Sequence, residues 1–173
     1  IMKVFNVNTD PKRTLEDDCL SIINLCSEFN SWIQGAGFEV FQIVFKDDAI
    51  TKQDHMSNLL SNIKKEANTI KSELKRVEKA NVKKPMKEVD EVYQNFRQIL
   101  KNHNGMQDIL RDVLERNYKK LRKEHGAAFG QKVRFINKID TIFRKILKRD
   151  TEKLQFYSKS AYNLYGKVRT RSS

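Results

Sequence analysis

Residues Pro85–His125 read PMKEVDEVYQNFRQILKNHNGMQDILRDVLERNYKKLRKEH, and their apolar side chains keep one helical register from end to end. Steps of three or four residues place these side chains on a single face of an α-helix. The predicted stripe consists of Val89, Tyr93, Phe96, Leu100, His103, Met106, Leu110, Val113, Asn117 and Leu121. A helix this long cannot bury its stripe alone, so other amphipathic segments must pack along it.

Three further segments, residues 11–34, 51–81 and 131–166, show the same periodicity and are predicted to be helices. Asp10 and Pro11 supply an N-cap and a first-turn proline for the first of them. In chain order, the three seams consist of Leu15, Cys19, Ile22, Cys26, Phe29 and Ile33; of Met56, Leu60, Ile63, Ala67, Ile70, Leu74 and Val77; and of Ile136, Ile139, Phe143, Leu147, Leu154, Tyr157, Ala161 and Leu164.

These segments predict an all-α fold, an elongated antiparallel bundle of about four long amphipathic helices joined by short turns. The glycine-containing residues 35–37 and 126–130 are the expected sites of two of these turns. We expect one domain over residues 1–173, with an N-terminal arm at 1–10 and a basic tail at 167–173.

Residues 38–45, FEVFQIVF, leave two structures open. Their β-branched and aromatic side chains favour a short β-strand. However, Phe38, Phe41 and Phe45 are also spaced for one face of a helix, and the only candidate for a partner strand is the arm at residues 2–7. In either structure, these side chains are expected to close one end of the bundle.

Two polar features interrupt the seams. Residues 102–105, NHNG, are typical of a helix end, but the stripe continues in phase across them, which favours one helix over 85–125 with a weak point at Gly105. Asp150 falls on the seam of the last helix. It is expected to be either an N-cap at a local kink or a partly buried carboxylate paired with Lys or Arg.

The two cysteines bear on the cellular compartment. Cys19 and Cys26 lie two turns apart on one predicted helix, about 10 Å along its axis. Because a disulfide needs Cα atoms within about 7 Å, we expect free thiols and hence a reducing compartment. The cytoplasm is the expected location, with the nucleus as the alternative. No apolar run approaches the roughly 20 residues that cross a bilayer.

The net charge of +12 is unevenly distributed. Residues 1–50 hold 4 Lys/Arg and 8 Asp/Glu, whereas residues 106–173 hold 18 Lys/Arg and 7 Asp/Glu. The C-terminal part should therefore attract polyanions, and the acidic first helix, residues 11–34, could recruit a basic protein partner.

The sequence offers no pattern typical of an enzyme, so no catalytic residue, metal ligand or cofactor is predicted. His55, His103 and His125 are scattered and have no second His or Cys at metal-ligand spacing. No glycine-rich phosphate loop occurs, because Gly35-Ala36-Gly37 lacks the Gly-Lys-Ser/Thr that would complete one.

The candidate binding residues are basic. Five of them lie opposite the apolar seam of the last helix, and three more precede the turn at 126–130, where cations also suit a helix C-terminus. The first group is Arg134, Lys138, Lys145, Lys148 and Arg149, and the second is Lys119, Lys120 and Lys123.

These residues predict a non-enzymatic interaction or scaffold module that engages protein partners and an anionic membrane surface through its basic side. The alternative is a nucleic-acid-binding module that uses the same residues, although no helix-turn-helix, RNP-type or zinc-finger pattern supports it. A second copy of the chain is a further candidate partner.

Overall fold

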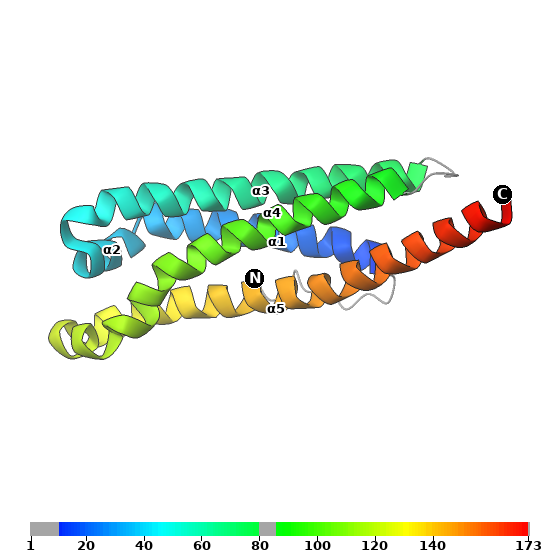
Figure 1. Cartoon of the computed structure of the whole chain (residues 1–173). Helices are drawn as coiled ribbons and strands as arrows, with labels where there is room; N and C mark the ends of the chain where they lie inside the picture. Colours follow the sequence, from blue (N-terminus) through cyan, green and yellow to red (C-terminus); the bar gives the residue numbers. More distant parts are fainter. Residues whose placement is uncertain (1–10, 80–85, 173) are drawn as a thin grey trace.

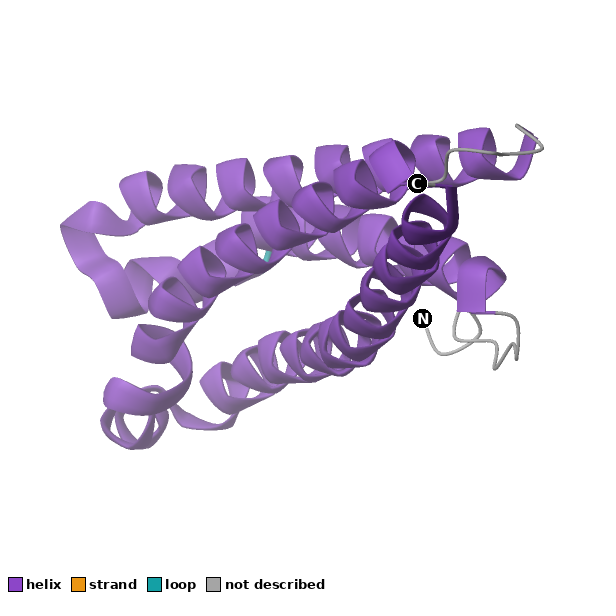
Figure 2. Ribbon diagram, turned by 45° about the vertical axis from the view of Figure 1, so that its right-hand side comes forward, coloured by secondary structure: helices purple, strands orange, loops and turns teal. Residues whose placement is uncertain are grey.

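The protein is an all-α bundle with four long helices (Figure 1). The computed structural model describes the backbone of residues 11–79 and 86–172, and the side chains of residues 15–75, 91–152 and Leu154. The long helices are α1 (Pro11–Gln34), α3 (Ala49–Lys79), α4 (Met86–Arg111) and α5 (Tyr118–Ser172). They run alternately in opposite directions, so the predicted antiparallel bundle is confirmed, and Figure 2 shows no strand among the described residues.

Three short elements connect the long helices. The α-helix α2 (Gly37–Phe45) and the 3-10 helix η2 (Lys46–Asp48) lie between α1 and α3, and the π-helix η3 (Asp112–Arg116) lies between α4 and α5. Residues 38–45 are therefore helical, which decides between the two alternatives. Helix α2 buries Val40 and Phe41 completely at one end of the bundle.

The apolar seams of α1, α3 and α5 are confirmed. Every predicted seam residue of 11–34 is buried, and so is every predicted seam residue of 51–81 and 131–166 whose side chain the structure describes. Val77, Tyr157, Ala161 and Leu164 lie outside the described side chains. Helix α3 packs against both α1 and α4, and α5 closes the bundle against the same two helices. The core thus runs along the whole length shared by the four helices.

Asp150 is fully buried within α5, and the helix passes through it without a break. The structure therefore favours the buried carboxylate over the N-cap at a kink.

Helix α4 continues through residues 102–105, as the seam suggested. A Cβ atom on Gly105 would approach the side chain of Leu59 on α3 to 3.2 Å. The glycine therefore lets two helices pack closely and does not end one of them. His103 is buried in the seam, together with Phe96, Met106, Leu110 and Val113.

The prediction of one continuous helix from 85 to 125 is wrong at residues 112–117. Here the chain forms the π-helix η3, followed by Asn117 with φ −118° and ψ 5°. A π-turn holds an extra residue, so it shifts the register of the side chains that follow. Asn117 consequently points into solvent, which corrects its place in the predicted stripe, while Tyr118 and Leu121 pack against the core.

The chain turns back at Gly126, within the segment predicted to be a turn. Gly126 has φ 78° and ψ −162°, a conformation that glycine adopts without the steric cost of a Cβ atom. The turn is shorter than predicted, because Phe129 and Gly130 already belong to the following helix and are buried. This helix returns along α1 and α4 (Figure 1).

Leu110 provides a test of the core, because its side chain is 0% exposed in the middle of the bundle. Leu110→Ala should lower the free energy of unfolding by ~2–5 kcal/mol, since the mutation leaves a cavity that the packed helices cannot fill. Leu20, which is 42% exposed on α1, gives the matched control. Urea unfolding should show a much smaller loss for Leu20→Ala, and equal losses would contradict the described packing.

The two cysteines are free and buried on α1, as predicted. Burial raises the pKa of the Cys26 thiol from its ordinary value of 9.0 to about 12. Burial also raises the pKa of Cys19, and the nearby carboxylates of Asp150 and Asp18 raise it further. Both thiols should therefore stay protonated and unreactive in the folded protein.

We expect the thiols to make stability fall with rising pH. The unfolded chain loses each thiol proton near pH 9, whereas the folded chain keeps that of Cys26 up to about pH 12. Between these values each thiol should lower the free energy of unfolding by about 1.4 kcal/mol per pH unit. Urea unfolding across this range should give a shallower slope for Cys26→Ala than for the parent. Identical slopes would show that Cys26 is accessible to water.

Candidate functional site

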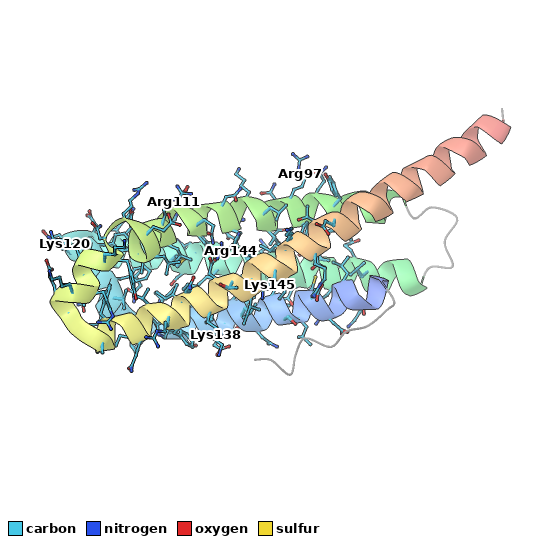
Figure 3. All side chains as sticks on the ribbon, turned by 90° about the horizontal axis from the view of Figure 1, so that it is seen from below. Arg97, Arg111, Lys120, Lys138, Arg144 and Lys145 are labelled. Atoms are coloured by element: carbon cyan, nitrogen blue, oxygen red, sulfur yellow. The ribbon has the colours of Figure 1, made fainter. Side chains whose placement is uncertain are left out.

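The candidate site lies on the part of α5 that follows Gly126. Arg134, Lys138, Lys145 and Lys148 are exposed there and form what we call the basic face. In the part of the chain whose side chains are described, none of these four residues forms an ion pair. Lys138 and Lys145 follow one another along α5 in Figure 3. The face therefore presents uncompensated positive charge to solvent.

Arg149 differs from the other four residues of the predicted stripe. Its Nη2 atom lies 2.5 Å from Oδ1 of Asp18 on α1, and its Nε atom donates a hydrogen bond of 3.3 Å to Oδ2. The side chain of Asp18 is only 5% exposed. Arg149 is exposed, as the stripe predicts, but it differs from the other four residues in having an acidic partner. It satisfies a buried carboxylate and ties α5 to α1.

Lys132 also tethers α5. Its ammonium group donates a hydrogen bond to Glu39 on α2, and this contact lowers the pKa of the Glu39 carboxyl. The two flanking cations, Lys132 and Arg149, are thus paired with acids on neighbouring helices, whereas the four residues of the basic face are not.

The second predicted cluster, Lys119, Lys120 and Lys123, is exposed between η3 and Gly126. Figure 3 shows Lys120 at the end of the bundle, away from Lys145. The cluster is therefore separated along the molecule from the Lys145 part of the basic face.

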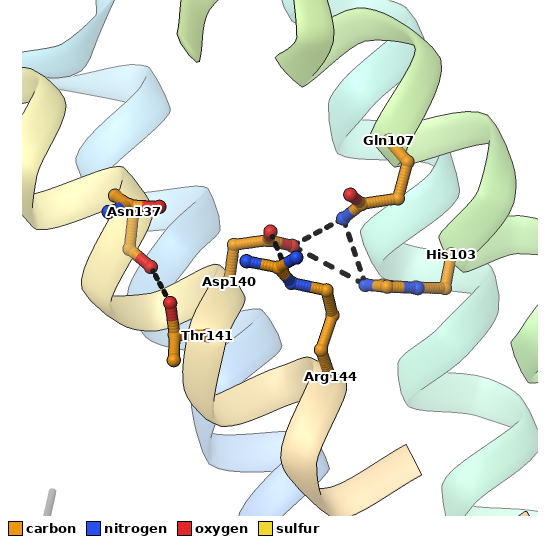
Figure 4. Close-up of polar contacts among 6 residues, drawn as sticks. All are labelled: His103, Gln107, Asn137, Asp140, Thr141 and Arg144. Carbon is orange, nitrogen blue, oxygen red and sulfur yellow. Dashed lines mark hydrogen bonds and ion pairs between the residues drawn. The ribbon is translucent and has the colours of Figure 1, made fainter. Parts of the chain in front are cut away.

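A buried polar cluster lies between α4 and α5 (Figure 4). The carboxylate of Asp140 is 1% exposed, and Oδ1 accepts a hydrogen bond from the Gln107 amide and lies 3.4 Å from Nε2 of His103. Its Oδ2 lies 3.1 Å from Nε of Arg144. The His103 ring stacks on Phe143, with 5.4 Å between the ring centroids. These contacts satisfy a carboxylate that would otherwise be costly to bury.

A groove of about 370 Å³ opens above this cluster, between α4–η3 and α5. Its lining combines an apolar part with three arginines, two amides and two carboxylates. The lining residues are Gln107, Leu110, Arg111, Leu114, Glu115, Tyr118, Val133, Arg134, Asn137, Asp140 and Arg144. Of the predicted binding residues, only Arg134 belongs to it.

The groove could not be predicted from the basic stripe, because Arg144 and Asp140 lie to one side of it. A signal was present in the central helix, where His103 interrupts an apolar seam and therefore needs a polar partner on a neighbouring helix. Asp140, next to the seam residue Ile139, is that partner.

Within the described residues, no group of His, Cys, Asp and Glu is arranged to hold a metal ion, and no helix has the length and apolar character needed to span a membrane. Comparison with protein-family models, curated proteins and solved structures gave no match to this chain. Functional inference therefore depends on the geometry of the chain's own residues.

Arg149 and Lys148 are adjacent and both exposed, but only Arg149 has a buried partner. Arg149→Ala should lower the free energy of unfolding by about 1–3 kcal/mol, because it leaves the Asp18 carboxylate buried without its cation. Lys148→Ala should stay within about 0.5 kcal/mol of the parent. Thermal unfolding of the two variants at neutral pH measures the difference. Similar losses would contradict the special role of Arg149.

Proposed function

We propose that the protein is a non-enzymatic helical interaction module that binds an anionic membrane surface through the basic face of α5. The observation that carries this proposal is the set of four exposed cations on one side of a continuous helix, with no acidic partner among the described residues.

The spacing of the basic face suits an extended anionic surface. Arg134 and Lys148 are separated by roughly 21 Å along the helix axis, at 1.5 Å per residue. Each basic residue near an anionic bilayer contributes about 1 kcal/mol to binding. Four such residues therefore correspond to roughly a thousandfold gain in affinity, because 1.4 kcal/mol is a factor of ten. The gain should fall steeply with salt.

The acidic N-terminal part supports a second role of the module, the binding of a basic protein partner. Asp47, Asp48 and Asp54 are exposed on η2 and the first turns of α3. These carboxylates lie on other elements than the basic face, which belongs to α5. The free, buried thiols of Cys19 and Cys26 support a reducing compartment, and we propose the cytoplasm.

The membrane proposal is tested by reversing charge on the basic face. The triple variant Lys138→Glu, Lys145→Glu, Lys148→Glu should lose binding to phosphatidylserine-containing vesicles in a co-sedimentation assay. Its circular dichroism should match that of the parent, because none of the three lysines has an ion-pair partner among the described residues. Arg149 is left intact because it supports Asp18.

The matched control is Lys46→Glu, Lys65→Glu, Lys101→Glu, which makes the same change in net charge at exposed positions on η2, α3 and α4. It should retain most of the binding. Equal losses of vesicle binding in the two triple variants would show that binding depends on net charge and not on the position of the lysines on α5. If the parent binds no anionic vesicle but binds nucleic acid at physiological salt, the nucleic-acid alternative replaces the membrane proposal.

A further inference from the structure

The groove beside the basic face concentrates arginine side chains from two helices. Arg111 comes from α4, and Arg134 and Arg144 come from α5. Figure 3 shows Arg144 between these two helices. Guanidinium groups bind phosphate and carboxylate through two parallel hydrogen bonds, which lysine cannot do. The groove is therefore better suited to recognising one anionic group than to following a diffuse surface.

The contacts of Arg144 leave part of its guanidinium group available. Its Nε atom is engaged by Asp140 at 3.1 Å, whereas neither of its terminal amino groups has a partner among the described residues. Asp140 is held in turn by Gln107 and His103 (Figure 4). This buried support fixes the direction of Arg144, so that a ligand does not have to order the side chain on binding.

The other two arginines are less constrained. Arg134 has no partner among the described residues, and Arg111 forms only an exposed pair with Asp108 at 3.5 Å. The lining also contains two carboxylates. That of Asp140 is already satisfied by its buried contacts, whereas Glu115 is exposed and repels an incoming anion. A ligand must therefore carry enough negative charge to overcome Glu115.

We propose that this groove binds a phosphate monoester on a small polar headgroup, with Arg134 and Arg144 as its main ligands and Arg111 at the rim. A phosphate monoester carries close to two negative charges at neutral pH, more than a carboxylate or a phosphodiester. Asn137 adds an amide group for hydroxyl groups of the headgroup, and Gln107 adds its side-chain oxygen, since its amino group is held by Asp140 and His103. The groove volume of about 370 Å³ is typical of a small-molecule site.

This inference rests on the proposed membrane function and deepens it. The basic face would draw the protein to any anionic bilayer, and the groove would select lipids whose headgroup ends in a phosphate monoester. The same chemistry occurs in soluble sugar phosphates, so the experiment must separate the two sources.

The test compares two kinds of vesicle at equal anionic charge, one containing phosphatidylinositol phosphate and one containing phosphatidylserine. Soluble inositol bisphosphate is titrated in parallel by calorimetry. The parent should prefer the phosphatidylinositol phosphate vesicles and should also bind the soluble compound. Arg134→Lys keeps the charge but loses the two-point geometry, and should weaken binding of the soluble compound by about tenfold, the loss expected for one charge-assisted hydrogen bond.

Arg116→Lys is the matched control, because Arg116 is exposed on η3, pairs with Asp112 and does not line the groove. It should bind like the parent. Arg144→Lys should weaken binding as Arg134→Lys does, and its thermal unfolding must be measured because Arg144 also contacts Asp140. Glu115→Gln should strengthen binding by removing the repulsive carboxylate.

The results separate the groove from the basic face. If Lys138→Glu, Lys145→Glu, Lys148→Glu loses binding to phosphatidylserine vesicles but still binds inositol bisphosphate, both proposals are supported. If the parent does not bind the soluble compound and does not prefer phosphatidylinositol phosphate vesicles to phosphatidylserine vesicles, the groove proposal is wrong. The proposal that the basic face binds anionic membranes is then unaffected. Preference for the lipid that survives Arg134→Lys and Arg144→Lys also overturns the groove proposal. If the parent binds the soluble compound but does not prefer phosphatidylinositol phosphate vesicles, the groove binds a phosphate monoester and its ligand is not a lipid.

Discussion

The burial of the apolar seam of α3 is the constraint on which the rest of the molecule depends. The helices α1 and α4 pack on α3 and close its seam off from water; the seam residues are Met56, Leu60, Ile63, Ala67, Ile70 and Leu74. Fully burying one such aliphatic side chain contributes about 1.5–3 kcal/mol. Helices α1 and α4 are themselves stabilised by packing their apolar faces against α3, because a helix in a protein takes most of its stability from such packing. Together they provide the surface on which α5 packs, and so they fix where its polar side lies.

Helix α5 is joined to this core by apolar and ionic contacts together. Phe143 and Leu147 fill the interior, Arg149 of α5 pairs with the buried carboxylate of Asp18 on α1, and the buried Asp140 of α5 contacts His103 and Gln107 on α4. Removing one partner of such a pair is costly, because the remaining charge stays buried. The arginines of α5 are therefore divided between holding the helix in place and facing solvent. Arg144 pairs through its Nε atom with Asp140 of its own helix and also lines the groove.

The sequence was sufficient to predict the helices and their buried faces, because periodicity reports directly which side chains share a face. It could not decide residues 38–45, whose composition suits both strand and helix, until their packing against the bundle was known. It favoured a continuous helix through residues 102–105, which is correct because Gly105 packs against Leu59 on α3, but it did not predict the interruption at residues 112–117. The π-helix η3 has no comparable signature in the residue pattern.

The candidate site was predicted only in part, because the sequence pattern reports the faces of single helices but not the contacts between helices. The solvent exposure of Lys138, Lys145 and Lys148 follows from their angle on one helix. The pairing of Arg149 with Asp18 depends on how two helices cross, and so does the meeting of Arg111 with Arg144 at one groove. Such relations between helices are set by tertiary packing, which no single amphipathic pattern contains.

Because α5 bends at Gly126 and is long beyond this point, a small rotation there produces a large displacement of its far end. From Gly126 to Ser172 the helix extends for roughly 70 Å at 1.5 Å per residue, and its last turns project beyond the other helices in Figure 3. A rotation of about 10° around Gly126 would move the far end by about 12 Å over that length. The Asp18–Arg149 pair and the contacts of Asp140 with His103 and Gln107 hold α5 to α1 and α4 along this length, so both must break before the far end can move.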